Sequence, residues 1–75
     1  MNRSVSFLLV LFPSVNQTMW ADSILRKSGI PHKMIPIPRD ISADCGVCIR
    51  VESGHAADVE KALGEIPLEW SIRPV

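Results

Sequence analysis

The stretch that decides the fold is SVSFLLVLF, residues 4–12, a continuous apolar run of strand length. Such a run is typical of a central strand that is covered on both faces of its sheet. Because it follows Arg3, it also resembles the start of a secretory signal peptide, but Pro13 ends it without a small-x-small cleavage site nearby. The run is far too short to span a bilayer. We therefore expect an internal strand and no membrane partner.

The segment after this strand has the pattern of an amphipathic helix over residues 15–28. Ser14 stands at the N-cap position, where its hydroxyl can accept a hydrogen bond from the first turn. Gly29 stands where a left-handed C-cap is expected, and Ile30 is placed for the usual apolar contact behind it. One face of the helix collects the residues that we expect to be buried, Thr18, Ala21, Ile24, Leu25 and Ser28.

Three more strands and one more helix complete the chain. Residues 32–37 predict a strand, which Pro36 restricts to the edge of a sheet because proline has no N–H to donate. Residues 46–51 predict a strand in which Cys48 and Arg50 face away from the apolar side. A second helix over residues 55–64 ends at Gly64, and an alternating strand follows at 68–73.

The order βαββαβ over 75 residues predicts one domain, residues 1–75, of the α+β class. We expect the ferredoxin-like arrangement, a four-stranded antiparallel sheet with both helices on one face. The first and third strands would then lie side by side in the middle. Leu8, Val10 and Phe12, or their alternates, would face the uncovered side and form an apolar strip suited to a partner or a homodimer.

Composition excludes several classes of function. The formal net charge is zero, which argues against a generic surface for nucleic acid or anionic membranes. The charges are unevenly placed, because residues 26–50 are mostly basic and residues 51–75 mostly acidic. Two cysteines three positions apart are not a secreted disulfide framework, so we expect a reducing cytoplasm.

Several motifs together resemble the Se/S carrier protein-like family, a family of small bacterial proteins. They are Phe12-Pro13-Ser14, Ser28-Gly29-Ile30, Pro36, Pro38-Arg39 and Ser42-Ala43-Asp44-Cys45-Gly46, and they run through most of the chain. The resemblance implies a non-enzymatic carrier that holds a persulfide or selenopersulfide on Cys45 and uses no other cofactor. It also implies a desulfurase or selenium-delivery enzyme as donor, and an acceptor protein. Cys48 departs from the family pattern, where a small apolar residue is usual.

A carrier thiol has to be ionised and reachable. An ordinary cysteine, with a pKa of about 8.5, is only a few per cent thiolate at neutral pH, and half ionisation needs about 2 kcal/mol of stabilisation. A guanidinium about 5 Å away, such as that of Arg39, supplies about 0.8 kcal/mol in water and about 3 kcal/mol when partly shielded. Gly46 and Ser42 are candidates for further hydrogen bonds to the sulfur, whereas Asp44 opposes ionisation.

The sequence allows two interpretations of Cys48. If residues 45–48 are extended, the two cysteine Cα atoms are about 10 Å apart, beyond the limit of about 7 Å for a disulfide. We therefore favour a sheet-face residue over a resolving partner in a redox Cys-x-x-Cys pair. A metal site is disfavoured, because His32 and His55 fall at the end of the sheet opposite Cys45.

The sequence leaves two alternatives to the carrier hypothesis open. The first is a non-catalytic interaction or dimerisation module that uses its open sheet face and has structural cysteines. The second is the redox dithiol. A sequence without a glycine-rich phosphate loop or a Ser-His-Asp set offers no better-defined enzyme class.

Overall fold

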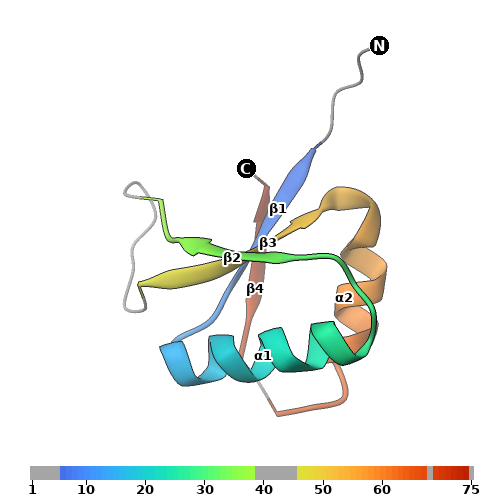
Figure 1. The fold of residues 1–75 in the computed structure, drawn as a ribbon, viewed down its shortest axis with the longest axis horizontal. Helices are drawn as coiled ribbons and strands as arrows, with labels where there is room; N and C mark the ends of the chain where they lie inside the picture. Colours follow the sequence, from blue (N-terminus) through green and yellow to red (C-terminus); the bar gives the residue numbers. More distant parts are fainter. Residues whose placement is uncertain (1–5, 39–45, 68, 75) are drawn as a thin grey trace.

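The computed structural model describes residues 6–38, 46–67 and 69–74. Its elements are β1 (Phe7–Leu11), α1 (Val15–Lys27), β2 (Lys33–Pro36), β3 (Val47–Glu52), the short 3₁₀ helix η1 (Ser53–His55), α2 (Ala56–Leu63) and β4 (Ser71–Pro74). Figure 1 shows α1 running across the strands, with α2 beside its C-terminal end. The four strands and two helices confirm the predicted α+β class and element order.

The strands form one antiparallel sheet in the order β2-β3-β1-β4. The predicted central pair is confirmed, since β1 pairs with β3 in a register that sets Leu8 opposite Val51 and Val10 opposite Ile49. β2 and β4 are the edges, and each contains a proline, Pro36 and Pro74. A proline at an edge breaks no internal ladder, as the sequence led us to expect.

One face of the sheet packs against both helices. Val10 and Ile49 are completely buried there, together with side chains from α1 and α2 and from the segments that flank the strands: Phe12, Ala21, Leu25, Ile30, Val51, Val59 and Leu63. Leu8 also packs against this cluster. The strand residues on the other face are therefore the alternates, Phe7, Leu9 and Leu11, because side chains alternate along a strand.

The boundaries of α1 follow from its predicted caps. Ser14 Oγ accepts a hydrogen bond from the backbone N–H of Gln17 at 3.2 Å. At the other end Gly29 adopts φ +74°, and Ile30, only 8% exposed, donates its N–H to the carbonyl of Leu25 at 3.0 Å. Among the residues expected on the inner face, Thr18, Ala21 and Leu25 are buried, Ile24 packs against the core, and Ser28 is exposed.

The C-terminal half follows the prediction with one shift. α2 begins at Ala56 after η1 and ends at Leu63, and the C-cap Gly64 donates its N–H to the Glu60 carbonyl at 2.8 Å. The last strand begins at Ser71, three residues later than predicted, and Trp70 and Ile72 pack against the core. Within the described residues no helix has the length and hydropathy needed to cross a membrane.

Replacement of Gly29 by alanine should lower the free energy of unfolding by about 1 kcal/mol, because a Cβ is disfavoured at positive φ. Gly54→Ala is the matched control, since a Cβ there also meets no atom within 4 Å but the backbone φ is not positive. Urea denaturation of both variants measures the difference. Equal stability of the two variants would contradict the assigned conformation of Gly29.

Candidate functional site

The candidate thiol site belongs to the connection between β2 and β3. The backbone N–H of Ile37 donates to the carbonyl of Gly46 at 3.2 Å and extends the ladder one pair beyond Pro36 and Val47. Arg39, Ser42 and Cys45 lie outside the described residues, so their predicted roles stay predictions. The structure does describe the residues on either side of this connection, up to Pro38 and from Gly46 onward.

This end of the sheet also holds the start of α1. Because β1 is antiparallel to β3, the end of β1 that leads into α1 is at the same end of the sheet as Gly46, which precedes β3. The first turn of α1 contains no acidic residue, so nothing in that turn offsets the partial positive charge of the helix N-terminus.

Gly46 is exposed, and its backbone does not require glycine. A Cβ built there meets no atom within 4 Å, and Gly29 is the described glycine with a positive φ. An anion-binding nest usually includes one residue in the left-handed region. Gly46 is not such a residue, so its contribution to a thiolate site would be space and a backbone N–H.

Cys48 lies in β3 and has no solvent-exposed surface. It is paired with Ile35 of β2, and the continued register sets Leu11 of β1 on its other side. The interpretation of Cys48 as a sheet-face residue is therefore confirmed, on the face opposite the helices. Because reagents and partner enzymes reach only exposed sulfur, this conformation keeps Cys48 from exchanging sulfur with another protein.

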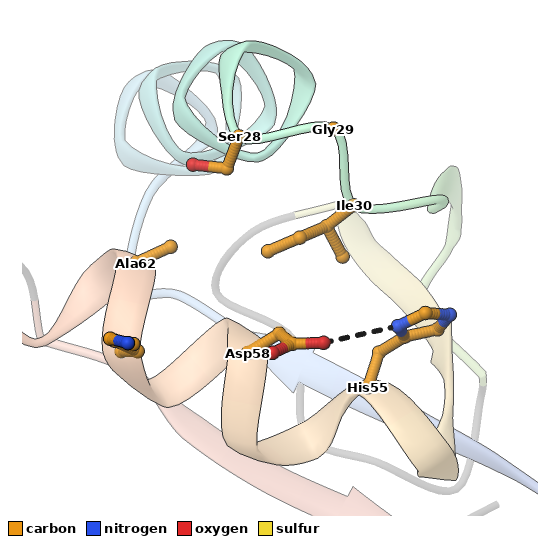
Figure 2. Close-up of a pocket in the computed structure, with 7 residues that line it drawn as sticks. Ser28, Gly29, Ile30, His55, Asp58 and Ala62 are labelled. Carbon is orange, nitrogen blue, oxygen red and sulfur yellow. Dashed lines mark hydrogen bonds and ion pairs between the residues drawn. The ribbon is translucent and has the colours of Figure 1, made fainter.

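The two histidines lie at the far end of the sheet, as predicted. His32 directly precedes β2 and His55 ends η1, which follows β3. Among the residues that the structure describes, no group of three or more histidine, cysteine, aspartate or glutamate side chains could hold a metal ion. An open hollow of about 350 Å³ lies at this end, and His55 Nδ1 is 3.4 Å from Asp58 Oδ2 on its wall. Figure 2 shows this pair together with Ser28, Gly29 and Ile30 from the end of α1.

Asp22 links the end of α1 to the start of β2. Its carboxylate accepts from His32 Nε2 at 2.6 Å and forms an ion pair with Arg26 one turn later in the helix. His32 Nδ1 lies 2.8 Å from the Ile30 carbonyl. Both ring nitrogens of His32 thus face acceptors, which leaves neither one for ligand binding and makes this cluster a structural clamp.

Sequence reasoning missed Gln17 in the first turn of α1. Its Oε1 is buried and finds no donor among the described residues, which is unusual for a side-chain amide. The residue was outside the predicted apolar stripe, and no local pattern marks a buried amide. Gln17 lies in the first turn of α1, where its backbone N–H donates to the Ser14 cap.

Asp22→Asn should destabilise the fold by about 1–3 kcal/mol, because the mostly buried His32 loses a charged acceptor. Asp58→Asn is the matched control, since its carboxylate is 61% exposed and 3.4 Å from His55. That variant should change stability by less than about 0.5 kcal/mol. Denaturant midpoints compare the two, and similar losses would contradict the clamp.

In a Cys45→Ser variant, the native Cys48 thiol should react with iodoacetamide at least about 100-fold more slowly than in denaturant. Its complete burial means that alkylation needs an opening of roughly 3 kcal/mol or more. Mass spectrometry over time measures the rate. Reaction at the unfolded rate without denaturant would show that Cys48 is accessible.

Comparison with known proteins gives one match. The model of the family described as "Putative Se/S carrier protein-like" matches residues 7–72. No curated protein and no solved structure matches the chain. The matched span runs from the first residue of β1 into β4, and it includes the Pro38-Arg39 and Ser42–Gly46 motifs. The chain therefore belongs to the Se/S carrier protein-like family.

Proposed function

We propose that the protein carries sulfur or selenium as a persulfide or selenopersulfide on Cys45, between a donor enzyme and an acceptor protein. Two observations support the proposal. The family description names this activity class, and the match covers the segment that contains the cysteine. The other cysteine, Cys48, is completely buried, which leaves Cys45 as the candidate for exchange with a partner.

The transfer needs neither an oxidant nor a resident cofactor. The Cys45 thiolate attacks the terminal sulfur of a persulfide, R–S–SH, on a donor such as a desulfurase. A bond forms between Cys45 Sγ and that sulfur, the donor's S–S bond breaks, and the donor leaves as a thiolate with the bonding electron pair. The proton stays on the transferred sulfur. A terminal selenium follows the same course.

A role as carrier sets two demands on the surroundings of Cys45. Arg39 is the candidate for stabilising the thiolate, and Ser42 and Gly46 are candidates for hydrogen bonds to it. The compartment also has to keep the thiol reduced, so we propose the cytoplasm. The N-terminus of α1, whose first turn has no acidic residue, is the described feature that suits an anionic cargo.

The rival function is an interaction module in which Cys45 is structural. This module has the same fold and the same open sheet face as the carrier, and a homodimer through that face is compatible with either function. The two functions differ in the role of Cys45. Charged substitutions at Val10 or Phe12 cannot test this rival, because both side chains lie in the core under the helices. A substitution of Cys45 distinguishes the two functions, because only the carrier needs the sulfur atom.

Cys45→Ser should abolish sulfur loading by a cysteine desulfurase, because serine cannot form a persulfide. Cys48→Ser is the matched control and should load as the wild type does, since a buried thiol is not needed for exchange. Intact mass spectrometry after incubation with desulfurase and cysteine reports the gain of one sulfur atom. A parallel incubation with a selenium donor distinguishes the two cargoes. Equal loading of the Cys45→Ser variant would overturn the carrier function.

A further inference from the structure

Three cationic side chains form a row across the face of the sheet that the helices leave open. The strand register pairs Lys33 with Arg50, Arg50 with Leu9, and Leu9 with Arg73, so one residue comes from each strand. Residues in such a row share a face, and neighbouring strands are about 4.8 Å apart. The row therefore spans about 14 Å and carries three positive charges.

Apolar side chains flank the row. Leu9, at its centre, is only 2% exposed, and the Arg50 guanidinium lies 4.4 Å from the centroid of the Phe7 ring. In the next row Ile35 and Leu11 lie on either side of Cys48, both half-buried. This mixture of arginine, aromatic and aliphatic side chains is the composition that is enriched in protein interfaces.

The three cations have no carboxylate partner in the described part of the chain. The ion pairs found there join Asp22 with Arg26 and His32, and Asp58 with His55, all at the helices. Glu52 is on the same face two residues along β3, but no ion pair joins it to Arg50. Lys33 and Arg73 are exposed, so their charges are available to another molecule.

We infer that this open face, defined by Lys33, Arg50 and Arg73 around Leu9, is the docking surface for a protein partner with an acidic and apolar face. Carboxylates of the partner pair with the row, and its apolar side chains cover Phe7, Leu11 and Ile35. Arg50 is held in place by Phe7, which lowers the ordering cost of a charged hydrogen bond.

Other occupants fit the charge pattern less well. A second copy of the chain, bound through the same face about a two-fold axis, would set cations against cations, which disfavours the dimer considered above. A nucleic-acid duplex usually engages about six or more phosphates, and a row of three cations on a chain of zero net charge offers half of that. The width of the row exceeds a single phosphate or carboxylate, so a protein surface is the best match.

This surface does not rest on the thiol function, and its test uses the Cys45→Ser background so that no sulfur chemistry contributes. The probe is a short amphipathic peptide with leucine along one stripe and glutamate beside it, titrated into isotope-labelled protein. Binding should shift the amide resonances of all four strands, β1 to β4, and leave α1 and α2 unchanged. Raising the salt from about 50 to about 500 mM should weaken it, because the Debye length shortens.

The double variant Lys33→Glu/Arg73→Glu should weaken peptide binding about tenfold or more. Lys27→Glu/Lys61→Glu is the control, with the same change in net charge on exposed positions of the helical layer, and should bind as before. Arg50→Gln tests the third cation, and unchanged spectra away from the site establish that it folds. The inference is overturned by no binding, by shifts on the helices, by equal weakening in the control, by equal affinity for DNA, or by self-association through this face instead.

Discussion

The register between β1 and β3 is the constraint on which the rest of the structure depends. Val10 opposite Ile49 puts both side chains under the helices, and Leu9 opposite Arg50 puts that pair on the open face. A slip of one residue would reverse every side chain of the strand and expose the core set. Burial of the apolar set in a chain of 75 residues, where little core is available, is what holds this register.

The same register also arranges charge and chain ends. Across the sheet it aligns Lys33, Arg50 and Arg73 into one charged row, and the antiparallel pairing puts Gly46 and the start of α1 at the same end of the sheet. The row is separate from the connection that carries Cys45, because Lys33 is the first residue of β2, next to His32, and Arg50 is four residues along β3 from Gly46. At about 3.3 Å per residue, Arg50 is about 13 Å from Gly46 along the strand. The surface inferred for docking and the segment proposed to carry the thiol therefore occupy different parts of the sheet.

Much of the fold could be predicted because local signals agreed with one another. Ser14 and Gly29 marked the ends of α1 through hydrogen bonding and backbone conformation, and Pro36 identified an edge strand through its missing N–H. The start of β4 was predicted less well, since LEWSIR alternates throughout and only pairing with β1 decides where the ladder begins. The thiol site rests on motif resemblance alone and stays a prediction, because Arg39, Ser42 and Cys45 lie outside the described residues. The buried Gln17 amide oxygen carried no local signal in the sequence.

By itself the sequence determined the order of elements, the caps of α1 and the family, because each depends on residues close together in the chain or on a motif read in order. Only the tertiary structure decided that Phe7, Leu9 and Leu11, rather than Leu8, Val10 and Phe12, face away from the helices. Only the tertiary structure decided that Cys48 is completely buried and that three cations far apart in the sequence lie in one row across the sheet. The reason is that the alternation of side chains along a strand predicts two faces but does not say which of them is buried. That is decided only when the helices pack against one face.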